Sequence, residues 1–258
     1  MNSELQIALI QSPLSWEQPE VNRKAFSQKL EMIADRTDLI VLPEMFTTGF
    51  TMTPEHINEV EGPRTLEWMQ MEAAKVNAAI CGSTVYREGG HYYNRLLFVK
   101  PEGEYIAYDK RHTFTLAGEH KIYTAGKSKQ LIEYRDFLIC PLICYDLRFP
   151  VWSRNVEGYD LLLYVANWPT PRVQAWDALL KARAIENMAY CAGVNRVGTD
   201  VNGHSYAGHS AVYDALGNSL VYSEEEAILY TGLSLSNLRE TREALKFLND
   251  RDAFTLAG

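Results

Sequence analysis

The chain has 258 residues, of which 47% are hydrophobic and 22% are charged, as is typical of a globular protein with one buried core. Its formal net charge of −8 excludes an overall basic surface, so we expect neither nucleic acid nor an anionic membrane as a partner. No apolar run approaches the length of a membrane-spanning helix, and the first residues lack the pattern of a signal peptide. We therefore expect a cytoplasmic protein whose four cysteines are reduced.

Apolar, strand-like runs alternate along the chain with amphipathic, helix-like segments. The expected strands cover, in chain order, residues 5–11, 39–42, 80–86, 93–100, 105–110, 137–143, 161–166, 190–194, 210–213, 218–222 and 227–233. The expected helices cover residues 19–36, 64–77, 174–188 and 236–247. Many strands with few helices predict an α/β protein in which helices cover layered sheets.

Three reactive side chains each follow an apolar run at the end of a predicted strand. Since strand ends can converge on one rim of a sheet, we expect these side chains to meet in one site built on rigid elements. The runs and the residues that follow them are 38–43 with Glu44, 105–109 with Lys110, and 137–143 with Cys144.

These three residue types suffice for a thiol amidohydrolase without histidine. A free cysteine has a pKa near 8.5 and needs a cation or a base beside it to attack at neutral pH. We expect Lys110 to supply a positive field for the Cys144 thiolate and later for the oxyanion of the tetrahedral intermediate. Glu44 would take the thiol proton, pass it to departing ammonia, and then activate the water that cleaves the thioester.

The sequence around these residues resembles the three signature segments of the nitrilase, or carbon–nitrogen hydrolase, superfamily, in that family's order. The likeness extends from the first strand to about residue 234. A further stretch, residues 160–172, which ends VANWPTPR, looks like the bacterial omega-amidase branch. The three signature segments are residues 42–46 (LPEMF), 108–112 (YDKRH) and 144–150 (CYDLRFP).

The resemblance implies a four-layer αββα sandwich formed by a single carbon–nitrogen hydrolase domain over residues 1–258. It also implies a homodimer, with the C-terminal tail from about residue 236 to 258 at the interface. The implied activity is hydrolysis of the distal amide of a 2-oxo dicarboxylic acid monoamide, such as 2-oxoglutaramate or 2-oxosuccinamate. The products would be the 2-oxo diacid and ammonia, and no cofactor or metal is needed.

Two further residues of the catalytic region follow from the same motifs. The family often carries a second glutamate after the lysine, and Glu119 fits that position, where it would hold Lys110 or Glu44 and direct the hydrolytic water. A sharp turn after the strand would aim the Tyr145 N–H at the oxyanion, as nucleophile elbows do. We expect Asp146 and Arg148 to pin that turn through an ion pair.

The carboxylate of the implied substrate requires a cationic side chain in the pocket, and Arg172 is the first candidate. Its alternative role is that of an exposed arginine at the start of a helix. Phe46, Phe114 and Trp168 are expected as apolar walls, although they suit an ordinary core equally. His112, close to Lys110 in sequence, is a further candidate for the pocket lining.

Other functions use the same residues differently. A nitrilase or carbamoyl-amide hydrolase would share the glutamate, lysine and cysteine, but Tyr145 and Asp146 follow the cysteine here, where many true nitrilases have Trp and Glu. A dimeric scaffold or redox-sensing thiol protein would not need Glu44, Lys110 and Cys144 together. The remaining cysteines, Cys81, Cys140 and Cys191, fit buried core positions, and no second close-spaced pair supports zinc. The sequence around Cys144 does not match papain-like proteases.

Overall fold

The computed structural model describes residues 4–34 and 36–256, which form two main β-sheets, a small hairpin and their covering helices. The first sheet contains β1 (Glu4–Gln11), β2 (Leu39–Val41), β3 (Ala79–Glu88), β4 (His91–Val99), β5 (Tyr105–Asp109) and β14 (Ala227–Ser234). The second contains β6 (Ile132–Tyr134), β7 (Phe137–Ile143), β8 (Leu161–Ala166), β9 (Tyr190–Asn195), β12 (Ser210–Tyr213) and β13 (Ser219–Ser223). The separate hairpin consists of β10 (Val197–Thr199) and β11 (Ser205–Ala207).

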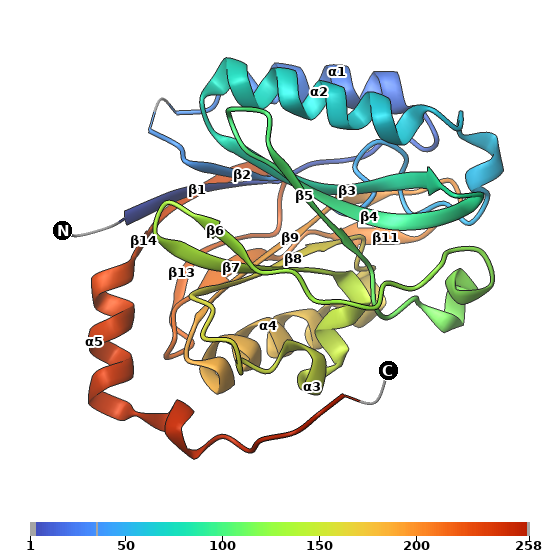
Figure 1. Ribbon diagram of the computed structural model, residues 1–258. Coiled ribbons are helices and arrows are strands. Elements are labelled where there is room, and N and C mark those ends of the chain that lie inside the picture. The colour runs from blue at the N-terminus through green and yellow to red at the C-terminus, as the bar shows by residue number, and fades with distance from the viewer. Residues whose placement is uncertain (1–3, 35, 257–258) are drawn as a thin grey trace.

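The helices lie outside these sheets. The α-helices are α1 (Pro19–Leu30), α2 (Glu61–Val76), α3 (Pro150–Ser153), α4 (Val173–Asn187) and α5 (Leu235–Leu245). Short 3₁₀ helices are η1 (Pro54–His56), η2 (Thr115–Ala117), η3 (Glu119–Lys121), η4 (Cys144–Arg148), η5 (Thr170–Arg172) and η6 (Phe247–Asp250). Helices α1 and α2 cover one sheet and α3 and α4 cover the other, so the predicted αββα sandwich is confirmed (Figure 1).

Each sheet has a parallel centre flanked by antiparallel strands. In the first sheet, with the order β14-β1-β2-β3-β4-β5, the strands β1, β2 and β3 run parallel. In the second, with the order β13-β12-β9-β8-β7-β6, the strands β7, β8 and β9 run parallel. Because β4 is antiparallel to both β3 and β5, the carboxyl end of β5 lies at the same edge as that of β2. The residues that follow these strands are therefore brought to one rim.

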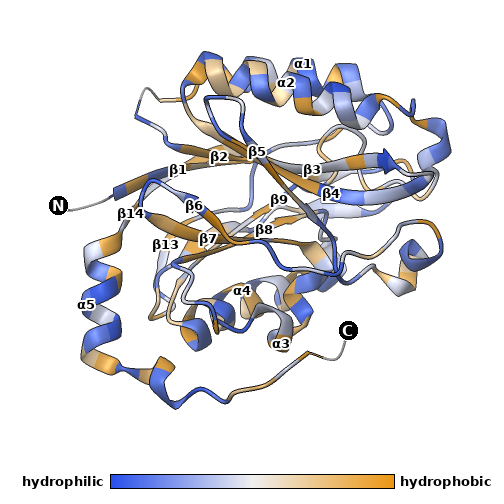
Figure 2. Ribbon diagram, in the orientation of Figure 1, coloured by the Kyte–Doolittle hydropathy of each residue, from blue (hydrophilic) through white to orange (hydrophobic). Residues whose placement is uncertain are grey.

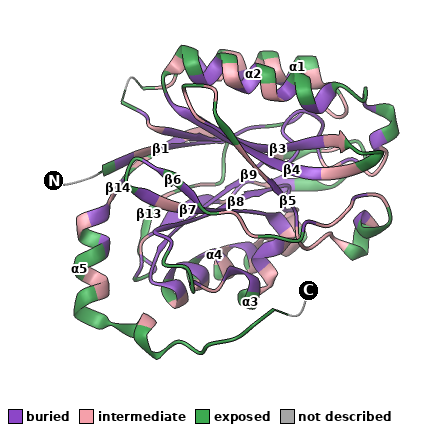
Figure 3. Cartoon of the chain, viewed as in Figure 1, coloured by how far each residue is buried: buried purple, intermediate pink, exposed green. Residues whose placement is uncertain are grey.

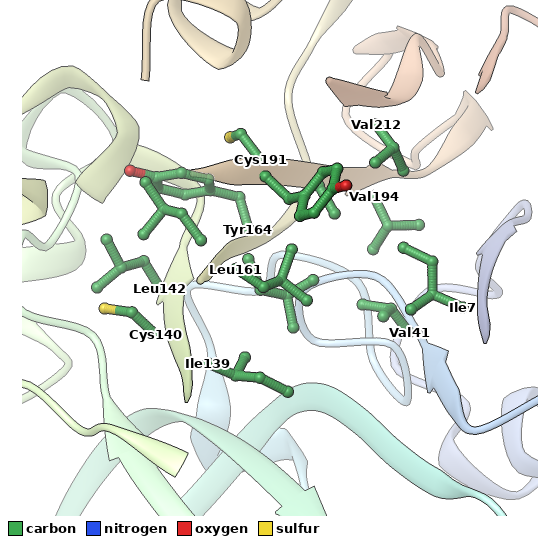
Figure 4. Packing of buried hydrophobic residues seen from close by; sticks show 14 of the residues in the cluster. Ile7, Val41, Ile139, Cys140, Leu142, Leu161, Tyr164, Cys191, Val194 and Val212 are labelled. Atoms are coloured by element: carbon green, nitrogen blue, oxygen red, sulfur yellow. The ribbon is translucent and has the colours of Figure 1, made fainter. Parts of the chain in front are cut away.

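The core lies between the two sheets, where apolar strand residues from both inner faces interdigitate. Ile7 and Val41 from the first sheet face Leu161, Val194 and Val212 from the second (Figure 4). The colouring by hydropathy shows the same division, with hydrophobic strands inside and largely hydrophilic outer helices (Figure 2). Burial of these side chains is the main source of stability for the sandwich.

Most expected elements are confirmed with small shifts of their ends. The expected helix over residues 19–36 ends at Leu30, because its apolar face, which buries Phe26, is not continued and Met32 is 64% exposed. Asp35, within that expected range, lies outside the described residues. Helix α2 begins before Pro63, since the first turn of a helix tolerates proline. Strand β6, helix α3 and the β10–β11 hairpin were missed because each is too short to show a periodic pattern.

The C-terminal segment lies outside the sandwich. Helix α5 stands beside the ends of the sheets, and the chain then runs along the outside of the layer that holds α3 and α4 (Figure 1). This segment is largely exposed (Figure 3), with Phe254 at 41% and Leu256 at 44%. None of the helices within residues 4–34 and 36–256 combines the length and the apolar character needed to span a membrane.

Candidate active site

A buried lysine held between two carboxylates forms the centre of the candidate site. Glu44 lies just after β2, Lys110 directly follows β5, and Glu119 begins η3. Lys110 Nζ donates to Glu44 Oε1 at 2.8 Å and to Glu119 Oε2 at 2.9 Å. All three side chains are 1% exposed or less. The structure thus brings together three of the four expected catalytic residues in one ion-paired cluster.

Two asparagines complete the hydrogen bonding of Glu44. Asn94 Nδ2, from β4, donates to Glu44 Oε1 at 2.8 Å and to Glu119 Oε1 at 3.2 Å. The backbone N–H of Asn167, just after β8, donates to Glu44 Oε2 at 2.8 Å. Sequence reasoning missed Asn94, although a buried polar residue within the apolar run of β4 is a usable signal. Every carboxylate oxygen of Glu44 therefore has a fixed partner.

Cys144 lies at a strained turn where β7 ends and η4 begins. Its φ of +44° is a left-handed conformation that residues other than glycine rarely adopt. Asp146 holds the turn, because its Oδ2 accepts from the Ile143 N–H at 3.1 Å and from the Tyr108 hydroxyl at 2.7 Å. The expected ion pair between Asp146 and Arg148 is wrong. The guanidinium of Arg148 lies instead over the Trp168 ring, 4.9 Å from its centroid.

Burial and the charge of Glu44 favour the protonated form of the Cys144 thiol. Together they raise the pKa of Cys144 well above its usual value, and Lys110 opposes them only in part. Burial by itself lowers the pKa of Lys110, but the charges of Glu119 and Glu44 outweigh it and the pKa rises. Burial also raises the pKa of Glu119, against the field of Lys110. The field of Lys110 thus acts on the thiol in the expected direction, but burial and Glu44 outweigh it.

A pocket opens beside this cluster, and Cys144, which is 9% exposed, is part of its lining. Of the residues expected to bind substrate, the pocket contains Phe114, Tyr145, Trp168 and Arg172. Arg148, which the sequence offers after Arg172 as a contact for the substrate carboxylate, lines it too. Sequence reasoning did not place six other lining residues, which are Phe50, Ala117, Asn167, Pro169, His204 and Tyr206. His204 and Tyr206 lie on the β10–β11 hairpin, whose polar, glycine-rich sequence predicts only a turn.

Two expected wall residues lie elsewhere. Phe46 is fully buried under α1 and α2, where its ring packs against Phe26 and Trp68. Its side chain points to that layer because the chain turns sharply at Met45, whose φ is +42°. His112 is also absent from the pocket lining within the described residues. Its ring stacks on Phe149 with centroids 3.7 Å apart, and its Nδ1 contacts Asp146 at 2.8 Å, so it helps to support the turn at Cys144.

Two arginines give the pocket a positive end. Arg172 lies over the Phe114 ring, 5.3 Å from its centroid, as Arg148 lies over Trp168. Neither guanidinium forms an ion pair or a hydrogen bond with any side chain among the described residues. Both are partly exposed at the pocket, so their charges are available to an anionic ligand. The same described residues contain no group of three or more His, Cys, Asp and Glu side chains suited to a metal ion.

Comparisons with known proteins identify the family and agree with the fold. A sequence model of the family described as carbon-nitrogen hydrolase matches residues 6–243. A protein of Yersinia enterocolitica named omega-amidase YafV is 47% identical over 98% of this chain and 99% of its own length. A 2-oxoglutaramate amidase of Bacillus subtilis is 33% identical over 95% of this chain and 96% of its own. The crystal structure of XC1258 from Xanthomonas campestris, a CN-hydrolase superfamily protein with an arsenic adduct in its active site, has a TM-score of 0.95 and 42% identity, and the match covers 98% of this chain and 99% of that one.

We predict that Glu44→Gln lowers the pKa of the Cys144 thiol while it reduces turnover by about 10²–10⁴-fold. The negative charge of Glu44 raises this pKa, so its removal leaves the field of Lys110 less opposed. Thiolate absorbance and the rate of iodoacetamide alkylation, each followed against pH, measure the shift. The same titration of Cys144→Ala gives the background from the other cysteines. An unchanged titration with unchanged turnover would contradict both parts of the prediction.

Proposed function

Because this chain belongs to the carbon–nitrogen hydrolase family, and is a hydrolase that acts on non-peptide carbon–nitrogen bonds of linear amides, we propose that it is an omega-amidase. Its proposed substrates are 2-oxo dicarboxylic acid monoamides, with 2-oxoglutaramate and 2-oxosuccinamate as the first candidates. The observation that carries this proposal is that Arg148 and Arg172 line the pocket that contains Cys144, and neither guanidinium has an ionic partner in the described part of the chain. The names of the relatives from Yersinia and Bacillus support it.

In the first half of the proposed reaction, the Cys144 sulfur attacks the amide carbon. Glu44 takes the thiol proton, which is consistent with a thiol that is neutral at rest. The carbonyl oxygen becomes an oxyanion, and the Lys110 ammonium and the Tyr145 N–H are its proposed donors. Glu44 then passes the proton to the amide nitrogen. The carbon–nitrogen bond breaks, ammonia leaves, and a thioester links the acyl group to Cys144.

In the second half, water attacks the thioester with Glu44 as the base. The water proton goes to Glu44 and returns to the sulfur as the carbon–sulfur bond breaks, which releases the acid and restores the thiol. Glu119 takes no proton in this scheme. It holds Lys110 through both of its oxygens and accepts the Phe114 N–H, which supports a positioning role.

The carboxylate at the far end of the substrate would bind the two arginines. A guanidinium matches a carboxylate with two parallel N–H donors and stays protonated at all accessible pH values. Phe114 and Trp168 hold the two guanidinium groups by stacking rather than by counter-ions, which leaves their hydrogen-bonding edges free. The cavity is small, about 90 Å³, which suits a short dicarboxylic acid monoamide.

We further propose that the protein is a cytoplasmic homodimer built as a single domain. Val151 on α3 and Ile185 on α4 expose apolar side chains at 51% and 45%, and the tail after α5 adds Phe254 and Leu256. A helix layer with exposed apolar residues, next to a largely exposed C-terminal segment, supports an interface on this side of the sandwich (Figure 3).

We predict that Cys144→Ala abolishes ammonia release from 2-oxoglutaramate while the fold persists, because no other thiol lies in the pocket lining. Mass spectrometry of the wild-type protein with a slow substrate should find an acyl adduct on Cys144. The other cysteines, Cys81, Cys140 and Cys191, are fully buried and serve as internal controls. An adduct on any of them would overturn the assignment of the nucleophile.

We predict that Arg172→Ala and Arg148→Ala each raise KM for 2-oxoglutaramate by roughly 10- to 100-fold, the effect of about 1.5–3 kcal/mol for a hydrogen bond to a charged group. The physical reason is the loss of one cation that faces the substrate carboxylate. Propionamide, which carries no charge, is the control and should be little affected. Equal losses for the charged and the neutral amide would show that the arginine is structural.

We expect light scattering to give a mass of about twice 29.4 kDa at micromolar concentration. The double substitution Val151→Glu and Ile185→Glu should shift this mass toward that of one chain, because it places charges within the proposed apolar interface. The opposite helix layer offers a control in Glu67→Lys, an exposed position on α2, which should leave the mass unchanged. A wild-type mass of one chain over the accessible concentration range would contradict the dimer.

A further inference from the structure

One buried polar atom beside the catalytic cluster has no partner. Asn167 lines the pocket and is 5% exposed, yet its Oδ1 accepts no hydrogen bond from any described residue. A buried acceptor without a donor is costly, and such atoms in native proteins call for an explanation. Because Asn167 belongs to the pocket lining and bonds to Glu44, a ligand in the pocket is the natural candidate for the missing donor.

Two other hydrogen-bonding groups of Asn167, its backbone N–H and its Nδ2, donate to Glu44. Its backbone N–H donates to Glu44 Oε2 at 2.8 Å, and its Nδ2 donates to the backbone carbonyl of Glu44. If the side-chain amide were flipped, Oδ1 would replace Nδ2 next to the Glu44 carbonyl, and two acceptors would face each other. The orientation is therefore fixed by the network, and Oδ1 points away from Glu44. Asn167 and Cys144 line the same pocket, which sets Asn167 in the neighbourhood of the nucleophile.

The neighbouring polar groups cannot supply the missing donor. Lys110 Nζ donates to both carboxylates, and Asn94 Nδ2 donates to the same two groups. Asn94 Oδ1 is itself occupied, because it accepts from the Ser83 hydroxyl at 2.9 Å. Among the described residues of this network, Asn167 Oδ1 is the acceptor that is left over, and it belongs to a residue that lines the pocket.

We propose that Asn167 Oδ1 accepts an N–H from the amide nitrogen of the substrate, next to the proton that Glu44 delivers. A primary amide has two N–H donors in the ground state and three once its nitrogen is protonated. One of them faces Glu44, and Asn167 supplies the acceptor for another. The contact strengthens as the nitrogen gains positive charge, because a hydrogen bond from a charged donor is about twice as strong as a neutral one. Asn167 thus assists the departure of ammonia as well as substrate binding.

This contact makes Asn167 a specificity residue for primary amides. A nitrile, an ester or a ketone has no N–H to offer, so each would leave Oδ1 buried and unpaired. Sites built to bond a polar group reject analogues that lack it far more strongly than they reject a change of size. The inference deepens the proposed function and rests on it, since it concerns the amide end of the same substrate.

The test measures binding in the Cys144→Ala protein, where no reaction occurs and the role of Glu44 in proton transfer has no effect. The ligands are 2-oxoglutaramate and 2,5-dioxohexanoate, which differ only in the exchange of NH₂ for CH₃. Calorimetry gives the ratio of their dissociation constants. Adding Asn167→Ala to the Cys144→Ala protein should weaken binding of the amide relative to the ketone by roughly five- to tenfold, the size of one net hydrogen bond.

The matched control is Asn94→Ala in the same background. Asn94 also contacts Glu44, but its Oδ1 is occupied, so its loss should weaken both ligands alike and leave the ratio unchanged. Asn167→Asp is the second variant, in case the alanine protein does not fold. A protonated aspartate can donate to the Glu44 carbonyl and still offer an oxygen to the amide, so the ratio should stay near that of Cys144→Ala.

The outcomes separate this inference from the proposed function. If Cys144→Ala binds neither ligand, the proposed substrate class is overturned and the Asn167 contact with it. If both ligands bind and Asn167→Ala leaves their ratio unchanged, the contact alone is overturned. A ratio shifted toward the ketone in Asn167→Asp would do the same. A purely structural role of Asn167 through Glu44 predicts equal losses for both ligands, as in Asn94→Ala.

Discussion

The burial of Lys110 between Glu44 and Glu119 is the constraint on which the rest of the site depends. The transfer of each of these ions out of water costs several kcal/mol, and good geometry with additional hydrogen bonds must offset that cost. Asn94 bridges the two carboxylates, and backbone N–H groups from Asn167 and Phe114 complete them. Burial and the charge of Glu44 together raise the pKa of the Cys144 thiol, although the Lys110 ammonium lies in the same cluster.

The sandwich is what brings this cluster to the cysteine. Glu44 and Lys110 follow strands of the first sheet, whereas Cys144 and Asn167 follow strands of the second. Packing of the two inner faces through the central core fixes the distance between the strand ends. A site that spans both sheets is therefore assembled only when the sheets pack in their native register. The left-handed turn at Cys144 adds local strain, which the hydrogen bonds to Asp146 hold in place.

The charged groups of the catalytic cluster and those of the two pocket arginines are held in different ways. The charges of Glu44, Lys110 and Glu119 are buried and paired, whereas Arg148 and Arg172 line the pocket without a counter-ion among the described residues. Aromatic rings lie against these guanidinium groups, which leaves their hydrogen-bonding edges open. Asn167, in the same lining, has a side-chain oxygen that accepts no hydrogen bond from the described residues. The proposed dicarboxylic acid monoamide would offer a carboxylate to the arginines and an N–H to this oxygen.

The sequence by itself determined most of the strands and the reactive residues at their ends, because both are local signals, whereas the four-layer arrangement followed from the family resemblance. Apolar periodicity gave β7 and β8 to the residue, and the runs before Glu44, Lys110 and Cys144 marked three strand ends that the structure places at one site. Only the tertiary structure decided what each side chain faces. It directed Phe46 into the layer under α1, set His112 against Asp146, and left Arg148 free rather than paired. It also revealed Asn94 and Asn167, whose importance comes from partners far away in the chain. Contacts between distant segments depend on how the two sheets pack, and neither periodicity nor short motifs carry that information.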